Sequence, residues 1–131
     1  MKRFFLLTLA SAALLGASAA PVKTYEVKSP DGRLALVLTA GERLSFTVAR
    51  DGETLVAPSE MALTLSTGEV LGESPRVRSA RRRAVTETID APLYRQSRFD
   101  AAYNELDLRL RGDYGILARA YDDGVCYRFY T

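Results

Sequence analysis

Two adjacent carboxylates, Asp122 and Asp123, stand in the segment "YDDGV" near the end of the sequence. Carboxylate oxygens are the ligands that calcium prefers, so this pair could hold a metal ion. The D-x-D-x-D-G spacing of an EF-hand loop is missing, however. The favoured interpretation is a plain turn at Asp123-Gly124, because Asp-Gly pairs tolerate the positive φ of tight hairpins.

A buried amide is expected in the segment "YNEL", residues 103–106. Asn104 has the same strand parity as the three leucines within residues 106–110, so its side chain points toward the apolar face. An unpaired polar group there would cost about 1–3 kcal/mol. We therefore expect Asn104 to hydrogen-bond backbone at a bulge or corner. The alternative is that it orients a neighbouring site.

The residue types exclude several kinds of active site. The chain has no histidine, the commonest general base, and one cysteine, so neither a Ser-His-Asp set nor a zinc spacing exists. We expect Cys126 to be a buried structural thiol rather than a reactive one. Asn104, Glu105, Asp122 and Asp123 remain as candidate binding residues. None is assigned a catalytic or metal-binding role, and no cofactor is expected in this chain.

Five arginines form the main charge cluster, in the segment "RVRSARRR". They are Arg76, Arg78, Arg81, Arg82 and Arg83. Such a run can bind polyanions. A solvated edge strand whose charges discourage edge-to-edge pairing is the favoured interpretation, because no aromatic residue interleaves the run. Nucleic acid is not expected as a partner.

The first nineteen residues have the pattern of a secretory signal. Lys2 and Arg3 precede an apolar run over residues 4–15, and the small residues of "GASAA" follow, with cleavage expected after Ala19. The apolar run is too short to span a bilayer. The two basic residues leave with the signal, so the 18 basic residues fall by two and equal the 16 acidic ones. We expect a periplasmic or extracellular protein that is not held in the membrane after cleavage.

Beyond the signal, apolar residues recur with period two between turn signals. Asp31-Gly32 and Asp51-Gly52 separate extended runs, and the runs 44–48, 61–65 and 106–110 each place apolar side chains on one face. Seven or eight short strands are expected. The pattern predicts an all-β fold, an antiparallel β-sandwich.

The stretch from 73 to 99 is less regular. Val85, Glu87 and Ile89 are predicted to form a strand that Pro92 interrupts, with the remainder as loop or edge.

The segments "SPDGRLALVLTAGERLSFTVARDGETLVAPSEMALTL", "YNELDLRL" and "RAYDDGVCYRFY" resemble the N-terminal domain of glycoside hydrolase family 97. The resemblance covers nearly all of residues 25–131. It implies a partial super-sandwich in an exported α-glucosidase or α-galactosidase, with a (β/α)8 barrel that carries the catalytic carboxylates and calcium. The aromatic residue common before "YNEL" in the family is Ala102 here, and a Trp usual in the preceding segment is missing.

The expected organisation is therefore a signal peptide, residues 1–19, and an N-terminal β-sandwich domain, residues 20–131, incomplete at its C-terminus. The resemblance implies that the barrel of the same polypeptide is its partner, that an oligosaccharide is the substrate of the whole enzyme, and that this chain alone is inactive. The alternative is a free-standing secreted module that binds carbohydrate or protein, with Tyr25, Tyr94 or Tyr114 stacking on sugars.

Overall fold

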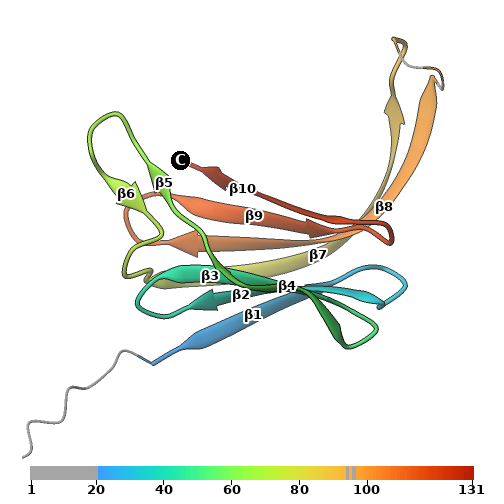
Figure 1. Cartoon of the computed structure of the whole chain (residues 1–131). Helices are drawn as coiled ribbons and strands as arrows, with labels where there is room; N and C mark the ends of the chain where they lie inside the picture. The colour runs from blue at the N-terminus through green and yellow to red at the C-terminus, as the bar shows by residue number, and fades with distance from the viewer. Residues whose placement is uncertain (1–20, 94, 96) are drawn as a thin grey trace, which may run out of the picture.

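The computed structural model describes residues 21–93, 95 and 97–131, which form ten strands and no helix. Two four-stranded antiparallel sheets stack face to face (Figure 1). The first has the order β1-β2-β3-β4, with β1 Lys23–Lys28, β2 Leu34–Ala40, β3 Leu44–Arg50 and β4 Glu53–Glu60. The second has the order β10-β9-β8-β7, with β7 Val77–Asp90, β8 Arg98–Leu110, β9 Gly115–Ala120 and β10 Val125–Tyr130. The predicted all-β antiparallel sandwich is confirmed.

Turn residues and alternation explain the first sheet. The β3–β4 turn has Asp51 at φ 50° and Gly52 at φ 84°, and two consecutive positive φ values match the right-handed twist of a hairpin. In β2 and β3 the apolar side chains alternate inward, and Leu36 lies opposite Val48 in the register. Pro58 lies in β4, an edge strand, where a missing N–H is tolerated.

The core lies between the two sheets and draws on both. Leu36, Leu38 and Leu44 of the first sheet are fully buried, as are Leu106, Leu108 and Ile116 of the second. Tyr114 is also buried, and its hydroxyl accepts a hydrogen bond from the backbone N–H of Gly72 at 3.2 Å. Among the described residues no helix is long and apolar enough to cross a bilayer.

The prediction that residues 61–65 place apolar side chains on one face was right only in part, since Met61 is buried and Leu65 packs against the core while Leu63 does not. The backbone N–H of Met61 donates to Leu44 O at 2.8 Å, and the Met61 side chain is buried. Met61 therefore still pairs with the first residue of β3. Leu63 is 42% exposed. Only β5, Leu63–Thr64, pairs, and its partner is the equally short β6, Val70–Leu71. This small hairpin rises beside the sandwich (Figure 1).

The hairpin of β7 and β8 extends past its sheet. β9 pairs with β8 only over residues 104–109, so residues 98–103 of β8 pair with β7 alone. We call residues 85–90 of β7 and 98–103 of β8 the arm. It bends away from the β1–β4 sheet (Figure 1). The predicted strand at 85–89 is confirmed, but it is part of a 14-residue strand, and residues 98–99, predicted as loop or edge, belong to its partner strand β8.

Candidate functional site

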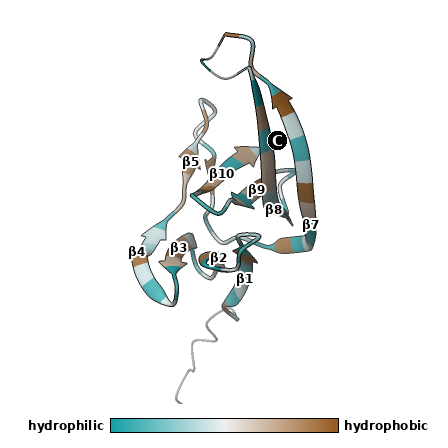
Figure 2. Ribbon diagram, turned by 90° about the vertical axis from the view of Figure 1, so that its right-hand side faces the viewer, coloured by the Kyte–Doolittle hydropathy of each residue, from teal (hydrophilic) through white to brown (hydrophobic). Residues whose placement is uncertain are grey.

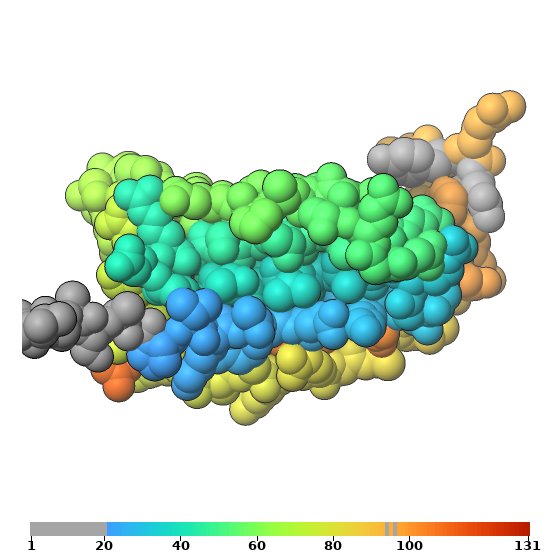
Figure 3. All heavy atoms as spheres, turned by 60° about the horizontal axis from the view of Figure 1, so that its bottom comes forward, coloured from blue at the N-terminus to red at the C-terminus, as the bar shows by residue number. Residues whose placement is uncertain are grey.

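Two side chains of the second sheet bind the free edge of β1. The amide Nδ2 of Asn104 donates to Lys28 O at 2.8 Å, and Nε of Arg82 donates to Glu26 O at 3.0 Å. Figure 3 shows why they can meet, because β7 runs along the molecule next to β1. A cavity of about 270 Å³ lined by these same residues opens between the two strands. The expectation that Asn104 hydrogen-bonds backbone is confirmed, but Asn104 is half-buried rather than buried, and the carbonyl belongs to the opposite sheet rather than to a bulge.

A third contact joins turns from the two sheets. Oδ1 of Asp122 accepts the backbone N–H of Asp31 at 2.9 Å. The Asp31 carboxylate accepts the Ser29 hydroxyl at 2.5 Å and the backbone N–H of Arg33 at 2.9 Å, and these two bonds hold the pKa of Asp31 below the ordinary value. The Tyr121 N–H bonds to Gly124 O, which closes the turn predicted for this segment. Asp122 therefore fastens one turn to another.

Glu105 lies on the other side of β8. Strand β8 alternates, so Asn104 points between the sheets while Glu105 points away from them. We call this side of the β10-β9-β8-β7 sheet the outer face. Glu105 is only 2% exposed there. Arg83 Nε donates to its Oε1 at 2.5 Å and Arg119 Nε to its Oε2 at 2.7 Å, from the two neighbouring strands.

The two arginines control the ionisation of Glu105. Burial raises the pKa of the Glu105 carboxyl, but the hydrogen bonds and charges of Arg83 and Arg119 outweigh it, so the pKa lies below its ordinary value. Burial lowers the pKa of Arg119, but the bond to Glu105, together with Tyr121, Tyr103 and the charge of Glu105, raises it above the ordinary value. The carboxylate is therefore charged at neutral pH and has both oxygens occupied.

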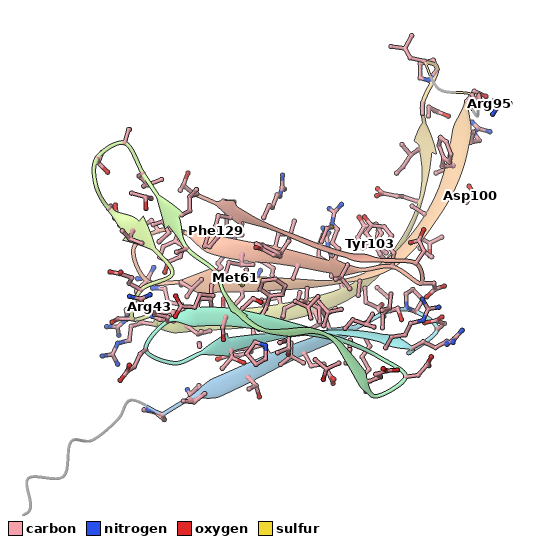
Figure 4. All side chains as sticks on the ribbon, viewed as in Figure 1. Arg43, Met61, Arg95, Asp100, Tyr103 and Phe129 are labelled. Carbon is pink, nitrogen blue, oxygen red and sulfur yellow. The ribbon has the colours of Figure 1, made fainter. Side chains whose placement is uncertain are left out.

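Aromatic side chains cover this charge cluster. Tyr103 rises from β8 at the base of the arm (Figure 4), and its hydroxyl donates to Glu87 at 3.0 Å. The guanidinium of Arg119 lies 4.5 Å from the centre of the Tyr103 ring, and the Tyr121 ring lies 4.9 Å away. Burial and the bond to Glu87 raise the pKa of Tyr103. Tyr103 is 3% exposed, so its ring offers no free face to a sugar.

Another tyrosine covers part of the outer face further along β8. Tyr130 of β10 lies over Gly115 of β9, where a Cβ would overlap the ring. Its hydroxyl donates to Asp107 of β8. Burial, and then the bond to Asp107, raise the pKa of Tyr130. Three strands of the outer face are thus tied together by side chains.

Four of the five arginines of the run lie on β7, an edge strand of its sheet as predicted, and Arg76 precedes that strand. Arg82 and Arg83 bind Glu26 O and Glu105 as described, although both are exposed, and Arg78 forms an ion pair of 3.7 Å with Asp113. Arg81 lies opposite Asp107.

Two sequence predictions were wrong. Cys126 is exposed rather than buried, because it points to the outer face of the edge strand β10, which no second layer covers in the described residues. Tyr114, expected at the surface, is buried in the core. Tyr25 is half-buried and packs on that core, and Tyr94 lies outside the described residues.

The donor sets do not fit calcium. The ion takes six to eight oxygen ligands, yet both oxygens of Glu105 are held by arginines and Asp122 already accepts a backbone N–H. Within the described ranges no three or more acidic, histidine or cysteine side chains are grouped to share a metal ion. The four candidate residues split between the inter-sheet contacts, Asn104 and Asp122, and the outer face, Glu105. Asp123 is exposed.

Sequence reasoning missed Arg83 and Arg119 as partners of Glu105. Their register explains the meeting, because both lie directly opposite Glu105 on either side. A sequence signal exists only once the pairing of strands is known. Polar residues of opposite charge at matching strand positions would then have indicated the cluster.

Comparisons with known proteins agree on one family. The retaining alpha-galactosidase of Bacteroides thetaiotaomicron is 38% identical over 107 residues, which is 82% of this chain and 16% of that protein. A glycoside hydrolase family 97 enzyme from Pseudoalteromonas sp., solved with panose, has a TM-score of 0.71 at 16% identity, covering 80% of this chain and 17% of that one. A beta-arabinopyranosidase structure gives a TM-score of 0.72 at 19% identity, covering 80% and 18%.

The chain therefore spans about a sixth of the length of these relatives. The structural likenesses show a shared fold, and the sequence match shows the family. Three segments quoted for the resemblance, "SPDG", "YNEL" and "YDDG", also meet in space at the end of β1. The model of the glycosyl-hydrolase 97 N-terminal domain matches residues 27–131, and the chain belongs to that family.

Proposed function

We propose that this chain is the non-catalytic N-terminal β-sandwich of a longer, secreted, calcium-dependent α-glycosidase. The rest of the polypeptide would supply a (β/α)8 barrel that cleaves an oligosaccharide. One observation carries the proposal: the family match covers residues 27–131, while the same region is 16% of a retaining alpha-galactosidase.

The chemistry of Glu105 supports a non-catalytic role. Glycoside hydrolysis uses two carboxyl groups flanking the scissile bond, and the general acid has a raised pKa. Glu105 is the buried carboxylate of this domain, and its pKa is lowered by two arginines that occupy both oxygens. It can neither donate a proton at neutral pH nor reach a substrate.

The calcium ligands of the proposed enzyme would come from other parts of the polypeptide, since the described residues group no three acidic side chains that could share an ion. Export rests on residues 1–19, whose charged, apolar and small-residue regions follow the pattern of a signal peptide. Those residues lie outside the described part of the chain.

The experiment compares this chain with the complete reading frame that encodes it. Both are purified and assayed on nitrophenyl α-glucoside and α-galactoside, with calcium and with a chelator. We expect turnover from the complete product only, and loss of that turnover with chelator. Turnover by residues 20–131 alone, or a complete product that cleaves neither substrate, would contradict the proposal.

A further inference from the structure

The chain contains three Asp-Gly pairs, and each lies in a turn between two paired strands. Asp31-Gly32 joins β1 to β2, Asp51-Gly52 joins β3 to β4, and Asp123-Gly124 joins β9 to β10. An Asp-Gly pair is open to attack by the backbone on the aspartate side chain, because glycine has no Cβ to hinder its own nitrogen. The surroundings of each pair therefore decide whether it reacts.

The reaction converts aspartate to isoaspartate. The glycine nitrogen attacks Cγ of the neutral aspartic acid, an N–Cγ bond forms, and the N–H proton leaves with the carboxyl hydroxyl as water. Water then opens the succinimide ring. Cleavage of the new N–Cγ bond restores aspartate, whereas cleavage of the original peptide C–N bond leaves the chain running through Cγ. No atom is gained or lost overall, and water is the only co-reactant.

The first pair, Asp31-Gly32, is held at both reacting groups. The Asp31 carboxylate accepts the Ser29 hydroxyl and the N–H of Arg33, and these bonds lower its pKa, which reduces the fraction of neutral acid. The N–H of Gly32 donates to Ser29 O at 2.9 Å. That hydrogen bond must break before the nitrogen can attack, so this pair resists the reaction.

The second pair, Asp51-Gly52, is held at the carboxylate. Its turn leads into the edge strand β4 and is exposed to water (Figure 2). Nε and Nη2 of Arg33 donate to the two oxygens of Asp51 at 3.0 and 2.8 Å, and this pairing lowers the pKa of Asp51. Ring closure would have to break both hydrogen bonds of a bidentate pair. Arg33, rather than burial, therefore protects this turn.

The third pair, Asp123-Gly124, is held at neither group. Asp123 is exposed, and in the part of the chain that the structure describes its carboxylate forms no hydrogen bond or ion pair. The N–H of Tyr121 donates to Gly124 O at 2.8 Å, while the N–H of Gly124 has no partner among the same residues. The neighbouring Asp122 is the carboxylate that binds the β1–β2 turn, which lies beside this one (Figure 1).

The backbone does not require glycine at position 124. Gly32 and Gly52 have φ of +75° and +84°, in the left-handed region, whereas the φ of Gly124 lies outside it. A Cβ added to Gly124 would meet nothing within 4 Å. Alanine therefore fits there without strain, and its methyl group hinders attack by the nitrogen. The variant Gly124→Ala separates the reactivity of the turn from its fold.

We propose that Asp123 is the site at which this domain forms isoaspartate, a spontaneous modification that the turns at Asp31 and Asp51 resist. The product has one extra methylene in the backbone of the β9–β10 turn. The adjoining Asp122 carboxylate is then displaced from the N–H of Asp31, so the modification loosens a contact between the two sheets. The modification is independent of the proposed function, since it needs only the folded turn.

Ageing of the complete product of the reading frame tests the proposal. The folded protein is kept in neutral buffer at physiological temperature for several weeks, and a sample in denaturant gives the intrinsic rate of each pair. Trypsin places the three pairs in separate peptides, residues 29–33, 51–76 and 120–128. Electron-transfer fragmentation then distinguishes aspartate from isoaspartate. Relative to the denatured sample, we expect isoaspartate to accumulate several-fold faster at 123 than at 31 or 51.

Two variants provide matched controls. Gly124→Ala should suppress isoaspartate at 123 and leave the unfolding midpoint unchanged. Arg33→Met frees the Asp51 carboxylate and keeps the backbone bonds of residue 33, so isoaspartate should rise at 51 and not at 123.

Three outcomes would overturn the proposal. In the first, the folded protein forms isoaspartate at 31 or 51 as fast as at 123. In the second, position 123 stays unmodified in the folded protein after it has reacted in denaturant. In the third, Arg33→Met still protects Asp51, which shows that the side-chain contacts do not select the site.

Discussion

Strand β8 serves two different regions of the molecule. Its inward residues, such as Leu106 and Leu108, fill the space between the sheets and are fully buried by apolar neighbours. Its outward residues, Tyr103 and Glu105, are almost as buried, yet their neighbours are arginines and tyrosines from adjacent strands. The inward residues of this strand are thus buried by apolar packing, whereas its outward residues are buried by hydrogen bonds, ion pairs and aromatic contacts.

This contrast between the inward and outward residues of β8 assigns a physical role to each residue of "YNEL". Asn104 and Leu106 face the first sheet, where one binds its edge and the other fills its core. Tyr103 and Glu105 face outward and bind Glu87, Arg83 and Arg119. A segment that looks like a small active-site motif in sequence is instead a set of structural contacts.

Leu106→Ala should give the largest loss, because it removes packing from the inner region. A fully buried leucine cut to alanine typically lowers the free energy of unfolding by about 2–5 kcal/mol. The matched control is Leu117→Ala on the half-buried outer face, expected to cost about 1 kcal/mol. Denaturant unfolding of both variants measures the difference. Equal losses would show that the outer face is packed like a core.

Glu105→Gln should come next, because it keeps the shape and removes the charge between two arginines. Hydrogen bonds to charged groups contribute about 1.5–3 kcal/mol, and the lower part of that range is expected because the Arg83 side chain is 65% exposed. The variant Glu105→Gln/Arg83→Gln provides the control, since a true pair makes the double loss smaller than the sum of the single losses. Additive losses would argue against the pair.

The same carboxylate should make stability depend on acid. Its pKa is lowered in the folded protein, so its contribution is present above the ordinary glutamate pKa of about 4.3 and is lost as pH falls through the lower folded value. The difference in unfolding free energy between the natural protein and Glu105→Gln should therefore be constant near neutral pH and shrink below about pH 4. A difference that stays constant to lower pH would mean that Glu105 does not carry the effect.

The sequence predicted the inner region better than the outer one. Period-two alternation and Asp-Gly turns identify the strands that line the core, since burial on one face leaves that signal. Asn104 could be predicted as hydrogen-bonded because its parity matches the leucines. Its acceptor, Lys28 O, could not, since nothing local says which strand lies across the sandwich.

The sequence-based prediction of the outer region failed for a related reason. Strand β7 carries arginines on both faces, so it lacks the apolar alternation that marks a strand, and its 14 residues were predicted only in part. Cys126 was predicted to be buried because free cysteines usually are, but β10 is an edge strand whose outer face is exposed. Pairing between strands, rather than local pattern, decides these positions.

Asn104→Leu should cost less than the Glu105 change, about 1 kcal/mol. The leucine keeps the apolar stem but leaves Lys28 O without the amide, and that carbonyl can still reach water at the edge of β1. Arg82→Met removes the parallel bond to Glu26 O and is the companion variant. Melting curves of both variants test whether β1 is held by side chains, and unchanged midpoints in both would reject that idea.

The smallest loss of stability is expected at the two neighbouring carboxylates, and it should differ between them. Asp122 accepts the N–H of Asp31 from the opposite sheet, whereas Asp123 is exposed at the turn. Because an intramolecular hydrogen bond contributes about 0.5–1.5 kcal/mol, and this one is exposed, Asp122→Ala should lower the free energy of unfolding by about 0.5 kcal/mol. Asp123→Ala should change it by less, as surface substitutions do. Chemical unfolding of the two variants, repeated with added calcium, measures both. If calcium stabilised the natural protein and either alanine variant abolished that gain, the pair would be a metal site and the structural role argued for Asp122 would be wrong.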